Sequence, residues 1–250
     1  MKDKNSSTSL SVFFPAYNEQ ENIGELLDEA LKVIPKLADD YEIIVVDDGS
    51  SDQTASVVKK YCQKNSGIKL VSHKINRGYG SAVWSGFKAA SKQLIFFCDS
   101  DRQFDLREIK KLLRYIDDFD AVVGYRNPRR DPKMRLLNAW GWKMLVRSLF
   151  KVKIRDVDCA FKLFRREALG GIQVKSRGAM FSAELMIRLI GKGAKIAQVP
   201  VGHYPRRAGK PTGASPKVIK KAFVELWRNK DELKKKISQI PPEKREIMSL

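Results

Sequence analysis

The first half of the chain alternates short, almost continuously apolar runs with longer segments whose apolar residues recur at helical spacing. Apolar runs of this length are typical of strands that are covered on both faces of a sheet. The pattern predicts strands at residues 10–14, 42–46, 68–72, 94–98 and 121–124. It predicts helices between them at residues 19–33, 53–64, 80–90 and 106–115. Such alternation indicates an α/β fold with a mostly parallel central sheet flanked by helices, in which ligands bind beyond the carboxyl ends of the strands.

The second half of the chain is more irregular and more basic. A basic loop at residues 124–133 precedes an amphipathic helix expected at 136–150. A strand at 158–164, a helix at 181–190 and a short strand at 195–199 follow, and residues 216–237 have helical apolar spacing. We therefore expect one large domain at residues 1–212 and a basic C-terminal amphipathic helix with a tail at residues 213–250.

Charge and cysteine content narrow the possible partners and compartment. The 48 Lys and Arg residues against 29 Asp and Glu give a formal net charge of +19, which favours nucleic acid, an anionic membrane or a phosphorylated substrate. The three cysteines have no paired spacing, which favours a reducing compartment. The first nine residues are polar, and no run approaches the roughly 20 apolar residues of a membrane span. We expect a cytoplasmic protein that is peripheral on the cytosolic face of a membrane.

Polar motifs follow three of the predicted strands. After the first strand, Tyr17 could stack on a base or sugar and Glu19 could accept from a ribose hydroxyl, although helix capping would also explain this turn. After the second, Asp47 and Asp48 leave a buried strand together, which is costly unless they bind a base, a ribose or a cation.

The third motif, residues 99–103, alternates carboxylates after the strand at 94–98. Asp99 and Asp101 could converge on one hard cation such as Mg²⁺, which prefers oxygen ligands and is commonly bound by carboxylates together with substrate phosphates. Two acidic residues can also simply begin a helix. Taken together, the three motifs lie at one edge of the predicted sheet and suit a ribonucleotide diphosphate with its metal.

With these motifs, the sequence resembles glycosyltransferase family 2, and within it the dolichyl-phosphate mannose synthase-like enzymes, which act on polyprenyl phosphates. The motifs that carry the resemblance occur in the family's order over roughly residues 8–215: Pro-Ala-Tyr-Asn-Glu (15–19), Val-Asp-Asp-Gly-Ser-Ser-Asp (46–52), Asn-Arg-Gly-Tyr-Gly-Ser-Ala (76–82), Asp-Ser-Asp-Arg-Gln (99–103), Gly-Tyr-Arg (124–126), Asp-Val-Asp-Cys-Ala-Phe-Lys (156–162) and Val-Pro-Val-Gly-His-Tyr-Pro-Arg-Arg-Ala-Gly-Lys (199–210).

The resemblance implies a GT-A fold, which is Rossmann-like, and a site that binds a nucleotide sugar. It implies a nucleoside pocket formed by Pro15, Tyr17, Glu19, Val46 and Asp48. It implies that Asp99, Ser100 and Asp101 bind the nucleotide sugar, with Asp101 and Gln103, and also Asp99, as ligands of Mg²⁺ or Mn²⁺. Arg126 and Arg206 are the expected contacts to donor or acceptor phosphates, and Lys210 is a further candidate.

The reaction that the resemblance implies is inverting transfer of a sugar from a nucleoside diphosphate to an acceptor. A phosphate acceptor is already largely ionised near neutrality and needs no strong base. A hydroxyl acceptor would need one, and Asp156, Asp158 or Glu184 are the candidates. Two alternatives stay open, a family 2 enzyme with a soluble acceptor and a basic nucleic-acid-binding protein, although no nucleic acid is expected as a partner.

The helix at 136–150 and the one at 216–237 each have apolar residues beside Lys and Arg, as helices in a membrane interface do. Both could instead pack on the core with their charges in solvent. His203, which follows the last predicted strand, is a candidate phosphate or acceptor contact.

Overall fold

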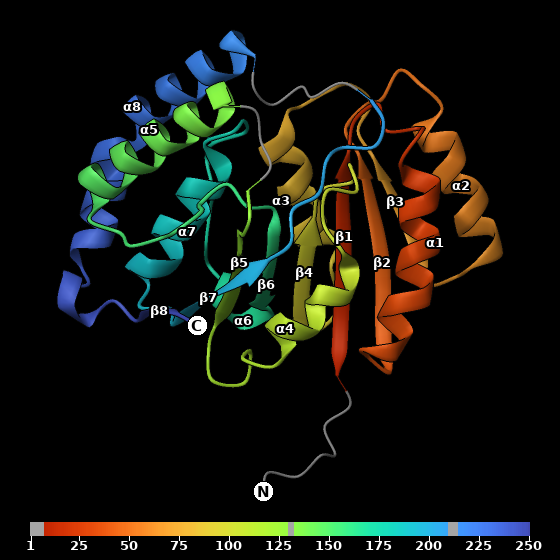
Figure 1. Ribbon diagram of the computed structural model, residues 1–250, viewed down its shortest axis with the longest axis horizontal. Helices are drawn as coiled ribbons and strands as arrows, with labels where there is room; N and C mark the ends of the chain where they lie inside the picture. Colours follow the sequence, from red (N-terminus) through yellow and green to blue (C-terminus); the bar gives the residue numbers. More distant parts are fainter. Residues whose placement is uncertain (1–7, 130–132, 210–214) are drawn as a thin grey trace, which may run out of the picture.

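A computed structural model describes residues 8–129, 133–209 and 215–250 of the chain. An eight-stranded sheet, ordered β3-β2-β1-β4-β6-β5-β7-β8, runs through the centre of the protein with helices on both faces (Figure 1). All neighbouring strands are parallel except β6, which is antiparallel to β4 and to β5. The prediction of a mostly parallel sheet flanked by helices is confirmed.

The elements have the following bounds. The strands are β1 (Ser9–Ala16), β2 (Asp40–Asp47), β3 (Ile68–Ser72), β4 (Leu94–Cys98), β5 (Ala121–Arg126), β6 (Phe161–Arg165), β7 (Ile196–Val201) and β8 (Ile247–Ser249). The α-helices are α1 (Ile23–Val33), α2 (Thr54–Lys64), α3 (Tyr79–Ala89), α4 (Ile109–Leu113), α5 (Lys133–Phe150), α6 (Arg166–Leu169), α7 (Phe181–Gly191) and α8 (Pro216–Ser238). The short 3₁₀ helices are η1 (Ile34–Lys36), η2 (Leu106–Glu108) and η3 (Pro242–Lys244).

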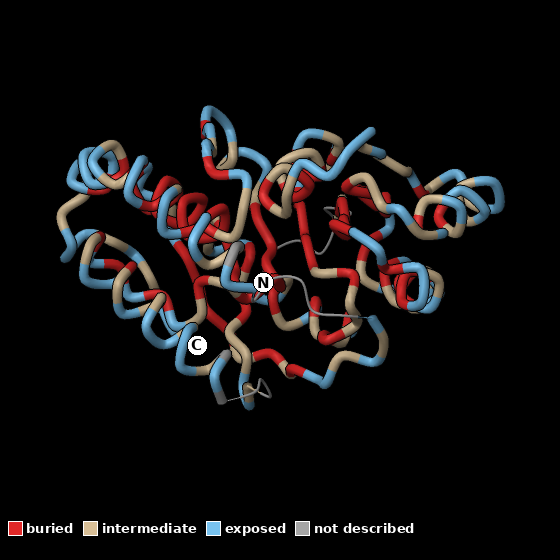
Figure 2. Tube along the Cα trace, turned by 90° about the horizontal axis from the view of Figure 1, so that it is seen from above, coloured by how far each residue is buried: buried red, intermediate tan, exposed pale blue. Residues whose placement is uncertain are grey.

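Successive side chains of the central strands enter two separate apolar layers, because strand side chains alternate between the faces of a sheet. Phe13 of β1 belongs to the apolar layer that α3, α5, α7 and α8 cover on one face. Its neighbour Phe14 packs with α1, α2 and α4 on the other. Figure 2 shows the buried backbone concentrated in the strands and along the inner sides of the helices. This double covering explains why the strands read as continuous apolar runs.

The C-terminal segment shares the sheet with the rest of the chain. One side of α8 is buried in the core through Ala222, Leu226, Leu233 and Ile237, and β8 pairs with β7. The segments on either side of residue 212, where we expected the domain to end, therefore contribute strands to the same sheet. Within the described ranges, no helix combines the length and the apolarity that crossing a membrane requires.

The strand order places several chain turns at one edge. β1 pairs with β2 on one side and with β4 on the other, so the order of the strands reverses at β1. β1, β2, β4 and β5 run in the same direction and end at the same edge, and β6 begins there because it runs the opposite way. In open α/β sheets, the point where strand order reverses is where ligands bind.

Candidate active site

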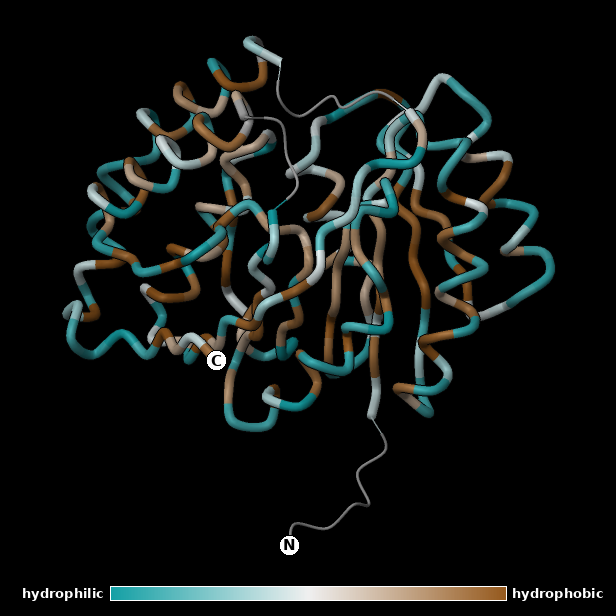
Figure 3. Tube along the Cα trace, viewed as in Figure 1, coloured by the Kyte–Doolittle hydropathy of each residue, from teal (hydrophilic) through white to brown (hydrophobic). Residues whose placement is uncertain are grey.

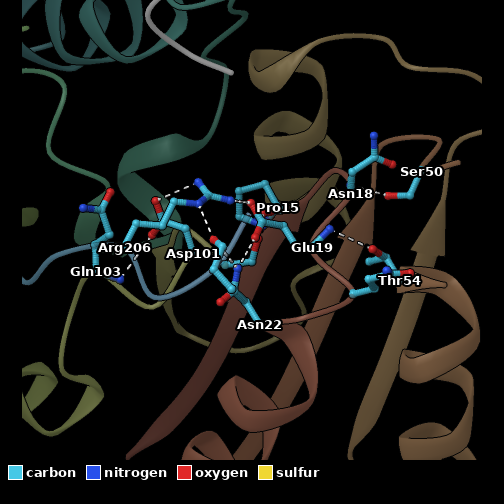
Figure 4. A network of polar contacts seen from close by, with 12 residues as sticks. Pro15, Asn18, Glu19, Asn22, Ser50, Thr54, Asp101, Gln103 and Arg206 are labelled. Carbon is cyan, nitrogen blue, oxygen red and sulfur yellow. Dashed lines mark hydrogen bonds and ion pairs between the residues drawn. The ribbon is translucent and has the colours of Figure 1, made fainter. Parts of the chain in front are cut away.

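The turns after β1 and after β2 are joined to each other by hydrogen bonds (Figure 4). The backbone amide of Asn18 donates to Ser50 Oγ over 2.9 Å, and Asn18 Oδ1 accepts from the backbone amide of Ser51 over 2.9 Å. The backbone amide of Glu19 donates to Thr54 Oγ1 over 2.9 Å. The protein thus fixes these two turns against each other. Helix α1 begins only at Ile23, four residues later than we expected, because residues 17–22 form this connection.

Asp48 organises a neighbouring loop. Its Oδ1 accepts from the backbone amide of Arg77 over 2.9 Å and lies 2.6 Å from His73 Nδ1, while its Oδ2 accepts from the amide of Gly78 over 2.8 Å. The residue is 3% exposed. Both oxygens of Asp48 thus hold the 73–78 loop. The nucleoside contact expected of Asp48 stays a prediction, while its observed partners are protein groups.

The remaining residues expected around a nucleoside are placed differently from one another. Tyr17 is 36% exposed at the rim of the β1 turn. The carbonyl of Pro15 accepts from Ser100 Oγ over 2.9 Å, which ties the first turn to the segment after β4. Val46 is wholly buried in the layer beneath α3, so its side chain offers no surface to a ligand, and a contact through that side chain is corrected.

Asp99, Asp101 and Gln103 lie on the turn after β4. Asp99 Oδ1 is buried and accepts no hydrogen bond, and the pKa of Asp99 is raised to about 7, first by burial and then by the charge of Asp101. Gln103 donates from Nε2 to the carbonyl of Tyr204 over 3.0 Å, a bond that orients the amide and does not use its oxygen. Two carboxylates and an amide oxygen are thus gathered on five residues.

These donors fit a divalent cation. All are oxygens, which Mg²⁺ and Mn²⁺ prefer, and a cation would offset both the burial and the charge of Asp101 that raise the pKa of Asp99. Across the described parts of the chain, no three or more His, Cys, Asp or Glu side chains converge as a metal site. Mg²⁺ is commonly bound by one or two carboxylates together with substrate phosphates, and the carboxylates of Asp99 and Asp101 with the amide of Gln103 suit such an ion.

Arg206 reaches this turn from the segment after β7, which crosses the edge of the sheet toward β1 (Figures 1 and 4). Its Nη1 lies 3.4 Å from Asp101 Oδ2, and its Nη2 donates to Glu19 Oε1. Both oxygens of Glu19 are engaged, because Asn22 Nδ2 donates to Oε2 over 2.6 Å. The ribose contact expected of Glu19 therefore stays a prediction, while its observed partners are protein side chains. Lys210 lies outside the described residues.

Arg126 and Asp156 form a buried pair at the same edge. Arg126 Nε and Nη2 donate to Asp156 Oδ2 and Oδ1 over 2.7 and 2.8 Å, a two-point arrangement. Burial raises the pKa of Asp156, but the bonds and charge of Arg126 outweigh it and lower the pKa to about 2. A carboxylate with so low a pKa is a weak proton acceptor, so the expectation that Asp156 serves as a base is corrected. It orients Arg126 instead.

A cavity of about 390 Å³ opens beside this pair, between α5 and the residues that precede β6. α5 contributes Leu136, Ala139, Trp140, Lys143 and Arg147 to its lining. Six cationic side chains face it: Arg126, Arg129, Lys143, Arg147, Lys153 and Arg155. Among the described residues, the acidic ones that line it with them are Asp156 and Asp158. A lining that combines cationic side chains with apolar side chains of α5 suits a phosphate that carries an apolar chain.

The two other candidate bases differ in their surroundings. Asp158 lines the cavity, and its pKa is raised to about 6 by burial and by the charge of Asp156. Glu184 is wholly buried on α7, where it accepts from the backbone amides of Lys175 and Ser176 over 2.9 and 2.8 Å and from Arg188 Nε over 2.7 Å. With both oxygens occupied inside the protein, Glu184 supports the segment before α7, and the expectation that it acts as a base is corrected.

Sequence reasoning missed three further features of this edge. Asn22 is 1% exposed and donates to both Glu19 and the carbonyl of Ala208, 186 residues later. Lys162 is buried with its ammonium on the carbonyl of Val157, and its charge acts on both Asp99 and Asp158. The cationic lining of the cavity comes from three separate segments.

His203 is 3% exposed with its ring 5.6 Å from that of Phe104.

Comparison with known proteins agrees with this geometry. The profile described as glycosyl transferase family 2 matches residues 11–172, which include the turns after β1, β2 and β4. The chain belongs to glycosyltransferase family 2. The family's match covers well over half of the sequence and ends shortly after β6.

Two curated relatives illustrate the range within this family. Dolichyl-phosphate beta-glucosyltransferase of Homo sapiens is 34% identical over 179 residues, which are 64% of this chain and 55% of the relative. Dodecaprenyl-phosphate galacturonate synthase of Rhizobium johnstonii is 27% identical over 212 residues, 83% of this chain and 62% of the relative. The chain thus spans between about half and two thirds of the length of these relatives.

Solved structures share the fold. Glucosyl-3-phosphoglycerate synthase of Mycobacterium tuberculosis superposes with a TM-score of 0.71 at 22% identity, over 90% of this chain and 80% of that one. The same protein has been crystallised with Mn²⁺ and uridine diphosphate, and with Mg²⁺ and uridine diphosphate. The GT-A fold expected from the sequence is confirmed by this similarity.

Proposed function

We propose that this protein transfers a sugar, with inversion, from a nucleoside diphosphate sugar to a polyprenyl phosphate. One observation carries the proposal: the acidic turn after β4 and the cationic cavity beneath α5 open at the same edge of the sheet. Only β6 separates β4 from β5, and the charge of Arg126 acts on Asp99. A donor on the acidic turn and a phosphate in the cavity would therefore be neighbours.

The donor half of the proposal rests on the oxygen donors of the turn after β4. Asp101, Gln103 and Asp99 would hold Mg²⁺ or Mn²⁺, which, when bound, stabilises the negative charge of a departing diphosphate. Arg206 lies beside Asp101 and would contact the same diphosphate. Tyr17 and the 73–78 loop that Asp48 holds would face the nucleoside.

The acceptor half rests on the cavity. Arg126, fixed by Asp156, presents a guanidinium at the boundary between the two halves, where it would position an acceptor phosphate. The cations of α5 add further charge, and Leu136, Ala139 and Trp140 offer an apolar path for a lipid chain. The relatives named for dolichyl, dodecaprenyl and undecaprenyl phosphate support this choice of acceptor.

The reaction follows as a single displacement. An oxygen of the ionised acceptor phosphate attacks the anomeric carbon, while the bond from that carbon to the diphosphate breaks and the diphosphate takes its electron pair. A phosphate monoester has a second pKa of about 6, so no side chain has to remove a proton. This matches a site in which Asp156 is paired with Arg126 and Glu184 is enclosed.

Replacing Asp101 by Ala tests the proposal. We expect transfer to a short-chain polyprenyl phosphate, in the presence of Mg²⁺ or Mn²⁺, to fall by about 100-fold or more, because the leaving diphosphate loses its main stabilisation. Asp117→Ala, which removes an exposed carboxylate elsewhere, should leave transfer unchanged. The alcohol of the same polyprenyl chain should accept no sugar. Near-normal turnover by the Asp101 variant, or equal transfer to the alcohol, would contradict the proposal.

The exposed face of α5 and α8 supports a membrane location for the acceptor. Trp140 of α5 is 58% exposed and Trp227 of α8 is 67% exposed. The two helices meet through Trp142 and Phe223, whose ring centroids are 5.6 Å apart. Figure 3 shows apolar positions interspersed with hydrophilic ones along both helices. Because Trp140 also lines the cavity, an anionic membrane on this face would lie next to the cavity.

A further inference from the structure

Arg206 is held in place by a chain of side chains that starts at Asn22. Asn22 Nδ2 donates to Glu19 Oε2 over 2.6 Å, and Glu19 Oε1 accepts from Arg206 Nη2. Arg206 Nη1 then faces Asp101 Oδ2 at 3.4 Å. Asn22, Glu19 and Arg206 come from two segments that are more than 180 residues apart in the sequence. The guanidinium of Arg206 thus lies between the carboxylates of Glu19 and Asp101, at the edge of the sheet where β1 and β4 end (the donor edge).

The backbone around Arg206 is shaped for this position. The carbonyl of Ala208 accepts both from Arg206 Nε over 2.8 Å and from Asn22 Nδ2 over 3.2 Å, so the segment folds back on its own arginine. Gly209 has φ of 78°, and a Cβ there would come within 3.2 Å of the guanidinium. Asn22 is almost wholly buried. Arg207, which follows Arg206 in the sequence, is exposed.

We infer that Asn22 and Glu19 are positioning residues that hold Arg206 against Asp101 as an internal cation of the donor site. The guanidinium neutralises two carboxylates, one of which is a ligand in the proposed metal set. A divalent ion on Asp101 would repel a guanidinium only a few ångströms away. Arg206 and the ion therefore repel each other in the absence of a diphosphate. A bound diphosphate would offset this repulsion, because its negative charge attracts both the guanidinium and the ion.

This arrangement has two opposite consequences that a merely structural arginine would not have. Without Arg206, the paired negative charge of Glu19 and Asp101 should attract a divalent cation more strongly. A nucleoside diphosphate without metal should bind more weakly, because the fork of donors that meets its phosphates is gone. The inference rests on the proposed donor site, but the first consequence can be measured without any nucleotide or transfer.

The experiment measures binding of Mn²⁺ alone by electron paramagnetic resonance, and binding of uridine and guanosine diphosphates in EDTA by calorimetry. In Arg206→Ala we expect the affinity for Mn²⁺ to rise at least about tenfold and the metal-free affinity for the diphosphates to fall at least about tenfold, a change of about 1.4 kcal/mol each. Arg206→Lys keeps the charge but not the two-point contact, and should give intermediate values of both.

Two further variants separate positioning from charge. Asn22→Ala should shift both affinities in the same directions as Arg206→Ala but by less, since Glu19 loses its orienting donor. Arg207→Ala removes the same charge from the next residue and should shift neither. An Arg206→Ala protein whose Mn²⁺ affinity is unchanged or lower would overturn the inference, as would equal shifts in Arg207→Ala. Wild-type values in Asn22→Ala would overturn the role of Asn22.

Loss of the proposed function would look different. If the purified protein transfers no sugar to polyprenyl phosphate, but the opposite shifts in Arg206→Ala are observed, the inference stands and only the acceptor assignment fails. If transfer is normal and the shifts are absent, the proposed function stands and Arg206 is not an internal cation.

Discussion

Buried carboxylates lie at both ends of β2, and at each end they are compensated by the protein. Asp48 follows the carboxyl end and holds the 73–78 loop. Glu42, near the other end, is 2% exposed and accepts from Ser11 Oγ over 2.6 Å, from Lys69 Nζ over 2.7 Å and from the amide and hydroxyl of Ser91. Full satisfaction of this kind is what makes a buried charge tolerable.

Glu42 makes stability depend on pH. Burial raises its pKa, but the bonds from Lys69, Ser11 and Ser91 outweigh burial and lower the pKa from 4.5 to about 2. Because the folded pKa is the lower one, this contribution is complete above about pH 4.5 and is lost as the pH falls toward 2. Glu42→Gln should therefore reduce the free energy of unfolding at pH 7 by up to about 3 kcal/mol and flatten its decline between these pH values.

Urea denaturation at a series of pH values measures this effect. Glu21→Gln, which neutralises an exposed carboxylate, is the matched control and should follow the wild-type pH profile. A Glu42→Gln protein with an unchanged profile would show that the charge of Glu42 does not stabilise the fold.

The sequence predicted which side chains gather at the donor edge but not how they are used. Asp48 follows β2, and Asp99 and Asp101 follow β4; these strands run in the same direction, so their carboxyl ends meet at one edge of the sheet. Their partners could not be predicted from local pattern. Arg206 reaches Glu19 from 187 residues away, and the 73–78 loop takes up both oxygens of Asp48. Such contacts depend on the paths of loops between elements, which apolar periodicity does not specify.

At the scale of elements, the ring of Phe13 from β1 packs directly against the backbone of α3 at Gly86. A Cβ on Gly86 would lie 2.3 Å from Cδ2 of Phe13. The ring of Phe13 itself contacts Phe87 and Phe97, with centroids 5.0 and 5.4 Å away. The glycine thus sets the distance between α3 and β1, the strand that precedes the turn at residues 17–22.

Gly86→Ala should destabilise the protein. Overpacking of a filled core costs about 1–3 kcal/mol, whereas the gain in helix propensity is at most about 1 kcal/mol, so the steric cost dominates. Gly141→Ala is the matched control, because it lies in α5 with nothing within 4 Å of its added Cβ, and it should stabilise the protein by up to about 1 kcal/mol. Thermal and urea unfolding compare the two, and equal stability of both variants would contradict this account of α3.

Apolar patterning predicted the bounds of some strands to the residue, but it did not predict the form of every helix or the pairing of every strand. The strands at 68–72 and 94–98 have the bounds that we expected. The helix expected at 106–115 is instead η2 followed by the five-residue α4, because its backbone tightens at both ends. The direction of β6 and the existence of β8 depend on pairing with distant strands, and three residues such as 247–249 carry no periodicity of their own.

At the scale of the whole molecule, positive charge and exposed apolar surface coincide on α5 and α8. The chain carries a net charge of +19. Beside the exposed Trp227, Lys230 places its ammonium 3.5 Å from the centre of the indole ring, and Arg147 of α5 is exposed and lines the cavity. Tryptophan next to Lys and Arg on the exposed side of a helix is typical of binding in a membrane interface.

Membrane binding through this face should depend on both salt and tryptophan. Each basic residue near an anionic surface contributes about 1 kcal/mol, and at about 0.5 M salt such contributions are strongly screened. We expect the protein to sediment with phosphatidylserine-containing vesicles at low salt, and to be released at high salt and from neutral vesicles. Trp140→Ala combined with Trp227→Ala should weaken binding about tenfold or more even at low salt, because the apolar anchors are lost. Met248→Ala, which removes an exposed apolar side chain from β8, should bind as the wild type does. Salt-independent sedimentation, or wild-type binding by the tryptophan variant, would mean that α5 and α8 do not form the membrane face, and the lipid chain of the acceptor would then have to reach the cavity from another side.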